Sequence, residues 1–142
     1  MFKRILTSLT LTLALCPLMA SAEITTLDVT VSGAEPATGT IEISVFASAE
    51  EFLKESKYQR QCKPSAEGSC SVNFLMSMPG DYAVAVVHDA NDNQKLDNGF
   101  LGFGAESFGY SNDASNPLFG RASFDDAKIA VSGDTRIEIV LD

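Results

Sequence analysis

Residues 80–89 read Gly-Asp-Tyr-Ala-Val-Ala-Val-Val-His-Asp, and this stretch decides the fold. It is the most apolar of the strand-like segments, and the turn Met78-Pro79-Gly80-Asp81 leads into it. A short apolar run bounded by turn residues is typical of a strand that is buried on both faces. We therefore expect residues 82–88 to form a central strand that delivers His88 and Asp89 at its end.

Outward from this strand, apolar side chains recur at every second position. They do so in two segments before it, at Leu27, Val29 and Val31 and at Ile41, Ile43 and Val45, and again in 70–76. Segments 127–131 and 135–141, joined by Ser132-Gly133-Asp134, are predicted to form a closing hairpin. These segments predict strands with one buried side.

Two segments depart from this alternation. Ser48-Ala49-Glu50-Glu51 has the Ser-x-x-Glu form of a capping box, which predicts a short helix near 49–57. Residues 98–120 have no clear period and are rich in glycine and phenylalanine, which predicts a long, ordered connection. About seven short strands, one short helix and this long Gly/Phe-rich loop indicate an all-β chain. The predicted fold is a single antiparallel β-sandwich of immunoglobulin-like or prealbumin-like type.

The chain begins with a segment that has the features of a secretory signal peptide. Lys3 and Arg4 precede an apolar run from Ile5 to Leu18, and Ala20-Ser21-Ala22 forms an A-x-A cleavage site. Residues 1–22 are thus the predicted signal peptide, and 23–142 the predicted domain. The apolar run is too short for a confident membrane span, so we expect a soluble periplasmic or extracellular protein without a transmembrane segment. Leu15 precedes Cys16 where lipid attachment favours a small residue, which disfavours a lipoprotein.

Charge and cysteine content agree with export. The net charge of −9 becomes −11 without the leader, which holds two basic and no acidic residues. This charge argues against nucleic acid or anionic membranes as partners, and it fits either cation binding or simple solubility. Cys62 and Cys70 are the only cysteines left after cleavage and should form one local disulfide in an oxidising compartment. Their C-x7-C spacing is wider than that of thioredoxin-like redox sites.

The segment after the central strand carries oxygen-bearing side chains at the spacing of a calcium loop. Asp89, Asn91, Asn93 and Asp97 occupy its first, third, fifth and ninth positions. The usual glycine at the sixth position is Gln94, and Phe100 stands where a glutamate would close the shell. Glu106 supplies the missing carboxylate if the glycine-rich segment folds back. The alternative is an Asx-rich turn that binds no metal.

A second candidate site combines aromatic and polar side chains. Aromatic rings beside amide and carboxylate groups suit a sugar or a peptide, and the candidate surface consists of His88, Glu106, Phe108, Tyr110, Ser111 and Asn112. The alternative is that the phenylalanines cap one end of the sandwich and the glycines allow tight turns. His88 is the only histidine, and a lone histidine is more often structural than catalytic.

Four ordered motifs together resemble a known bacterial family. They are residues 80–89, residues 91–97, the segment Leu101-Gly102-Phe103-Gly104-Ala105-Glu106-Ser107-Phe108-Gly109-Tyr110-Ser111-Asn112, and residues 119–127. The chain resembles the exported family catalogued as domain of unknown function 2141 over nearly all of its mature length. That family usually has a proline between the glycine and the glutamate of the middle segment, where this chain has Gly104-Ala105. The resemblance implies an exported β-rich domain with its motif residues gathered in one loop region.

Two classes of function remain open on these observations. The first is a non-enzymatic exported module whose Asp/Asn loop binds calcium and whose surface contacts a protein, glycan or envelope partner. The second is a small periplasmic hydrolase or transferase that uses His88 with Asp89 or Glu106 as acid and base. The second lacks a clear nucleophile, because Gly109-Tyr110-Ser111-Asn112-Asp113 matches the G-x-S-x-G elbow only loosely. The first class is therefore preferred.

Overall fold

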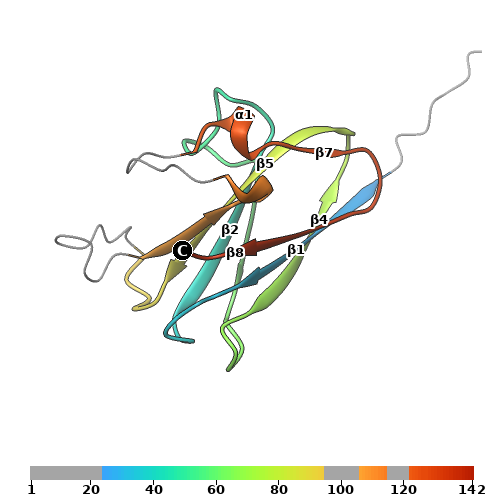
Figure 1. Cartoon of the computed structure of the whole chain (residues 1–142). Helices are drawn as coiled ribbons and strands as arrows, with labels where there is room; N and C mark the ends of the chain where they lie inside the picture. Colours follow the sequence, from blue (N-terminus) through green and yellow to red (C-terminus); the bar gives the residue numbers. More distant parts are fainter. Residues whose placement is uncertain (1–23, 95–105, 115–121) are drawn as a thin grey trace, which may run out of the picture.

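The computed structural model describes residues 24–94, 106–114 and 122–142. The predicted signal peptide, residues 1–22, and Asp97 lie outside the described residues. Two packed sheets form a β-sandwich (Figure 1), so the predicted all-β sandwich is confirmed. In this part of the chain there are eight strands, rather than about seven. None of the helices among these residues has the length and apolarity needed to cross a membrane.

The smaller sheet has the strand order β4-β1-β8, and the larger has the order β3-β2-β5-β6 with β7 also paired to β5. The smaller sheet consists of β1 (Thr25–Ser32), β4 (Cys70–Met76) and β8 (Thr135–Val140). The larger consists of β2 (Thr40–Phe46), β3 (Tyr58–Cys62), β5 (Gly80–Asp89), β6 (Ser107–Tyr110) and β7 (Ile129–Val131). Because β5 pairs with β2, β6 and β7, the prediction of a central apolar strand is confirmed.

The core lies between the two sheets, where the period-two apolar positions meet. Leu27, Val29 and Val31 of β1 face Ile41, Ile43 and Val45 of β2 across it, and all six side chains are fully buried. A second, smaller cluster covers the other face of β5 at one end and contains Phe46, Phe52, Ala83, Ala85 and Ala127. This explains why both faces of β5 are apolar in that region.

Strands that follow one another in sequence lie in different sheets at both ends of the domain. The turn-rich segment 33–39 carries the chain from β1 in the smaller sheet to β2 in the larger one. The predicted closing hairpin is wrong, because β7 pairs with β5 and β8 pairs with β1. The β1–β8 pair is also parallel, so the sandwich is not purely antiparallel. Alternation predicts that a segment is a strand, but it carries no information on the partner strand.

The helix predicted near 49–57 is also wrong. Residues 47–54 form turns with isolated hydrogen bonds, such as Phe52 N to Ser48 O at 3.1 Å, and Leu53 has a left-handed φ of 58° that ends any helical path. Packing of Phe52 against Phe46 and Phe124 competes with the local helical signal. The one α-helix described is α1 (Phe124–Ala127), where Ser123 and Asp126 form the capping box.

The segment 98–120 contains a strand where an irregular connection was predicted. Its described part forms β6 and the 3₁₀ turn η1 (Ser111–Asp113). A Cβ atom on Gly109 would lie 2.7 Å from Ile139 Cγ2, so only glycine permits β6 to approach β8 this closely. The amide of Asp142 then donates to the carbonyl oxygen of Phe108 at 3.1 Å, which links the two sheets.

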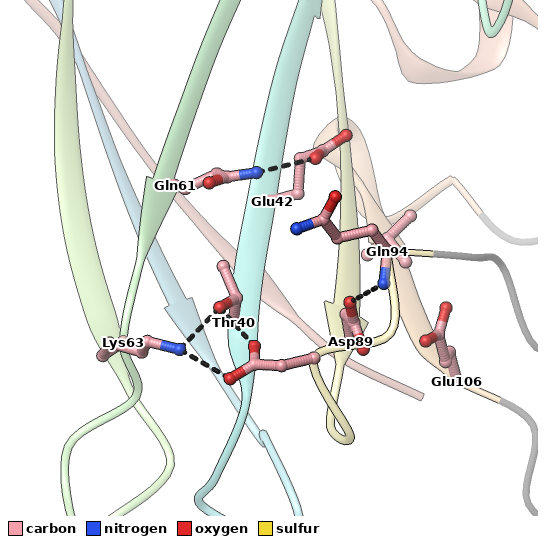
Figure 2. Close-up of a pocket in the computed structure, with 9 residues that line it drawn as sticks. Thr40, Glu42, Gln61, Lys63, Asp89, Gln94 and Glu106 are labelled. Carbon is pink, nitrogen blue, oxygen red and sulfur yellow. Dashed lines mark hydrogen bonds and ion pairs between the residues drawn. The ribbon is translucent and has the colours of Figure 1, made fainter.

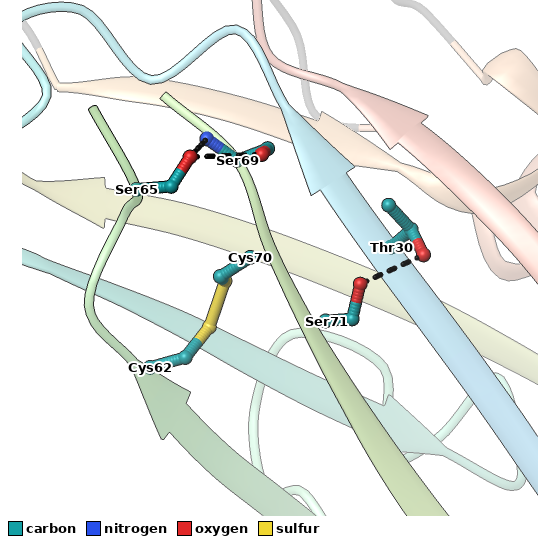
Figure 3. The surroundings of a disulfide bond; sticks show 6 residues. All are labelled: Thr30, Cys62, Ser65, Ser69, Cys70 and Ser71. Carbon is teal, nitrogen blue, oxygen red and sulfur yellow. Dashed lines mark hydrogen bonds between the residues drawn. A yellow bond between two sulfur atoms is a disulfide. The ribbon is translucent and has the colours of Figure 1, made fainter. Parts of the chain in front are cut away.

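At the opposite edge, a disulfide links the sheets. Cys62 ends β3 of the larger sheet and Cys70 begins β4 of the smaller one, and the predicted bond between them is present (Figure 3). The enclosed loop is organised by Ser65 and Ser69, whose hydroxyl oxygens lie 3.1 Å apart. The disulfide therefore fixes the position of Lys63, the first residue of that loop.

Candidate functional site

The outer face of the larger sheet carries polar residues in rows that cross its strands. Glu42 of β2 lies opposite Gln61 of β3 on one side and Val87 of β5 on the other. Val87 in turn lies opposite Phe108 of β6. Directly opposed residues in an antiparallel pair share a face of the sheet. The row Gln61-Glu42-Val87-Phe108 is therefore continuous across four strands.

A second row runs beside the first at the end of these strands. Thr40 lies opposite Asp89, Lys63 directly follows β3, and Glu106 directly precedes β6. Together the two rows border a groove of about 570 Å³, which we call the outer groove (Figure 2). It is lined by Thr40, Glu42, Gln61, Lys63, Val87, Asp89, Asp92, Gln94 and Glu106. Four carboxylates and one ammonium make this lining net negative.

The loop after β5 forms one wall of the outer groove, and Asp89 organises it. The amides of Asn93 and Gln94 donate to the two oxygens of the Asp89 carboxylate at 3.1 and 2.8 Å. The side-chain oxygen of Asn91 accepts from the Asn93 amide at 3.0 Å. The alternative Asx-turn geometry is therefore present. Gln94 has a φ of 58°, so the sixth loop position adopts the backbone conformation that glycine usually supplies in calcium loops.

Lys63 and Thr40 hold this loop against the sheet. The Lys63 ammonium donates to Asp92 Oδ2 at 2.9 Å and to Thr40 Oγ1 at 2.7 Å, and the Thr40 hydroxyl donates to Asp92 Oδ1 at 2.5 Å. The hydrogen bonds from Thr40 and Lys63, together with the lysine charge, lower the pKa of Asp92 from its ordinary value of 3.8. Asp92 therefore stays ionised at neutral pH and fixes the loop to β2.

The model of a family described as "Uncharacterized protein conserved in bacteria (DUF2141)" matches residues 29–138. The chain belongs to the DUF2141 family. The match runs from β1 to β8 and so includes the whole outer groove. Searches of curated proteins and of solved structures found no match.

This DUF2141 domain places several of the predicted site residues on one face. Phe108 and Tyr110 alternate along β6 on the outer face of the sheet, and Glu106, which directly precedes β6, lines the outer groove with Asp89. Phe108 is 43 % exposed, and its ring centroid lies 5.8 Å from that of Tyr110. An exposed aromatic ring thus lies opposite Val87, one of the residues that line the outer groove.

Other predicted residues lie elsewhere in the DUF2141 domain. His88 points into the sandwich and is 1 % exposed, with Nε2 2.7 Å from the Thr38 carbonyl oxygen. Because a carbonyl oxygen only accepts, Nε2 carries a proton in this contact. Ser111 is fully buried between β5 and α1, where its hydroxyl accepts from the Val84 amide and donates to the Ala127 carbonyl oxygen. Asn112 is exposed and donates to the Asp126 carbonyl oxygen at 2.8 Å.

The metal assignment stays a prediction. Within 24–94, 106–114 and 122–142, no three His, Cys, Asp or Glu side chains form a metal-binding group, while Asp97 lies outside those ranges. Of the groove residues, only Asp89 and Glu106 were predicted as site residues; those not predicted are Thr40, Glu42, Gln61, Lys63, Val87, Asp92 and Gln94. The signal for Thr40, Glu42 and Gln61 is that polar side chains alternate with other residues along β2 and β3. The sequence does not give the register between these strands, which is needed to place the residues beside Asp89.

Proposed function

We propose that this protein is a non-enzymatic exported module that binds calcium at the Asp/Asn loop and presents the outer groove to a protein or glycan partner. The observation that carries this proposal is that four carboxylates, those of Glu42, Asp89, Asp92 and Glu106, line one groove whose described lining has a single ammonium. Such a site attracts cations and repels anionic ligands.

The donor set fits a hard cation. Carboxylate and amide oxygens are the ligands that calcium prefers, and the predicted set consists of Asp89, Asn91, Asn93, Asp97 and Glu106. Asp89, Asn91 and Asn93 lie in one turn that the Asp89 carboxylate already orders. Glu106 lines the same groove as Asp89, which supports its role as the additional carboxylate.

The position of His88 favours a binding module over the hydrolase or transferase alternative. Its imidazole lies on the inner face of β5, whereas Asp89 and Glu106 border the outer groove. A general base must reach the proton that it removes, directly or through one water molecule. His88 instead contacts the Thr38 carbonyl oxygen, so it helps to hold the segment before β2 beside the loop that follows β5.

Calcium titration of the mature, disulfide-intact protein tests the proposal. The protein is first freed of metal with EDTA, dialysed, and titrated calorimetrically with calcium chloride. We expect saturable binding with a dissociation constant on the order of 10⁻⁴ to 10⁻³ M, the range of extracellular calcium modules. Bound calcium should also raise the melting temperature, because it binds the folded state only.

Matched variants locate the site. Glu106→Gln should weaken calcium binding, whereas Glu50→Gln, which removes the same charge from an exposed position outside the groove, should leave it unchanged. Magnesium chloride serves as the control for nonspecific divalent binding. Absence of calcium binding, or equal effects of the two variants, would refute a calcium site at the outer groove.

A further inference from the structure

Among the described residues that line it, the outer groove has one cationic side chain, that of Lys63. The Lys63 ammonium lies between Asp92 Oδ2, at 2.9 Å, and Thr40 Oγ1, at 2.7 Å. The three groups come from different elements. Lys63 follows β3 and Thr40 begins β2 (Figure 2), whereas Asp92 belongs to the loop after β5. An intrachain cation therefore neutralises one of the four groove carboxylates in this structure.

A neighbouring disulfide holds the backbone of Lys63 in place, but the ion pair between Lys63 and Asp92 is open to solvent. Cys62, the preceding residue, is fixed by its disulfide to Cys70. The side chains of Lys63 and Asp92 are 67 % and 50 % exposed. Ion pairs between exposed side chains contribute little net stability, and a free lysine side chain is well hydrated. Lys63 can therefore leave Asp92 at small cost while its backbone stays in place.

A cationic ligand of the outer groove must compete with this resident charge. A second positive charge close to Asp92 is repelled by the ammonium and finds one carboxylate already neutralised. We infer that Lys63 is an internal competitor that sets the affinity of the outer groove for cations, and that a bound cation displaces its ammonium from Asp92. This inference rests on the proposed function, because it requires that the groove bind a cation.

The inference is tested by removing the charge of Lys63. Lys63→Met keeps most of the length of the side chain and abolishes its ammonium, while Lys57→Met makes the same change at an exposed position outside the groove. Lys63→Arg retains a cation at the site. Each protein is titrated calorimetrically with calcium chloride and, separately, with spermidine, so that a metal and an organic cation are distinguished as sources of the same charge.

We expect Lys63→Met to bind at least one of these cations about tenfold more tightly than the natural protein, as the loss of a unit charge a few ångströms away predicts. Lys57→Met and Lys63→Arg should stay within about twofold of the natural protein, because neither removes positive charge from the groove. A gain confined to calcium identifies a metal site, and a gain for both probes identifies a general cation site.

Two results would overturn the inference, and they differ in what they say of the proposed function. If the natural protein binds calcium but Lys63→Met binds neither calcium nor spermidine more tightly than Lys57→Met does, Lys63 is not a competitor and the proposed function stands. If neither the natural protein nor Lys63→Met binds either cation, the proposed function and the inference both fail. Thermal unfolding of each variant confirms that the compared proteins are folded.

Discussion

Gly39 lies directly against Asp89, since a Cβ atom on Gly39 would come within 2.0 Å of the Asp89 carbonyl oxygen. Gly39 also has a φ of 76°, a left-handed conformation that other residues adopt only with strain. Its neighbour Thr38 donates from its hydroxyl to the Ala90 carbonyl oxygen at 3.2 Å. The segment before β2 thus packs backbone to backbone on the start of the Asp/Asn loop, with no space for a side chain.

Gly39→Ala is therefore expected to destabilise the fold by about 2–4 kcal/mol, because it adds both a backbone clash and conformational strain. It should also displace the Asp/Asn loop and weaken cation binding. Urea unfolding followed by circular dichroism measures the change. Gly133→Ala is the control, since its Cβ would meet no atom within 4 Å, and it should change stability by less than about 0.5 kcal/mol. Similar losses in the two variants would contradict this explanation.

Replacement of both Cys62 and Cys70 by alanine should lower the free energy of unfolding by about 2–3 kcal/mol, as expected for a short closed loop. The β3 and β4 edges should remain paired with β2 and β1, because those pairings do not depend on the bond. Comparison of urea unfolding with and without a dithiol reductant checks this. The reductant should destabilise the natural protein and leave the double variant unaffected. If it acts equally on both, the disulfide is not the reduced group.

Ser111→Ala should destabilise the fold by about 1–3 kcal/mol without a direct effect on cation binding. The substitution leaves the Val84 amide without its 2.8 Å acceptor in a buried region. Ser77→Ala, at an exposed position between β4 and β5, is the control and should be nearly neutral. Chemical denaturation gives the stability change, and calcium titration of the folded variant gives the affinity. A large loss of affinity with unchanged stability would instead place Ser111 in the ligand site.

The ion pair at the loop predicts a pH effect. The pKa of Asp92 is lowered in the folded protein, so this carboxylate contributes stability above its ordinary pKa of 3.8, and the contribution is lost as the pH falls through the lowered value. Carboxyl NMR titration should show Asp92 protonating below pH 3.8. Lys63→Met should move this pKa upward, whereas Lys57→Met should not. An unchanged Asp92 pKa in Lys63→Met would contradict the contact with the ammonium.

Most strands could be predicted from the sequence. A strand that is buried on one side has apolar residues at every second position, and this pattern is visible within a single segment. Leu27, Val29 and Val31 show this period, and β1 is found there. β6 was not predicted, since a strand of four residues that contains Gly109 gives almost no periodic signal. The helix was placed near residue 49 because local capping chemistry was present there, but tertiary packing of Phe52 overrode it.

The candidate site could be predicted only in part, because the sequence does not show which residues of different strands lie side by side. Asp89 and Glu106 were identified because each lies in a polar motif, and the structure places both on the outer groove. His88 was expected beside them as a sequence neighbour, yet adjacent strand residues point to opposite faces. Lys63 and Glu42 were not identified, because their proximity to Asp89 depends on the register of β3, β2 and β5.

The parallel pairing of β1 with β8 has a consequence for the order of folding during synthesis. Residues 27–32 pair with residues 135–140, so β1 and β8, the first and last of the described strands, are direct neighbours. A ribosome releases β1 long before β8 exists, and until then the smaller sheet has only β1 and β4. Contacts between such distant positions form slowly and late. A growing chain therefore cannot complete this domain until its final strand has emerged, and any fragment that ends before residue 135 should remain incompletely folded.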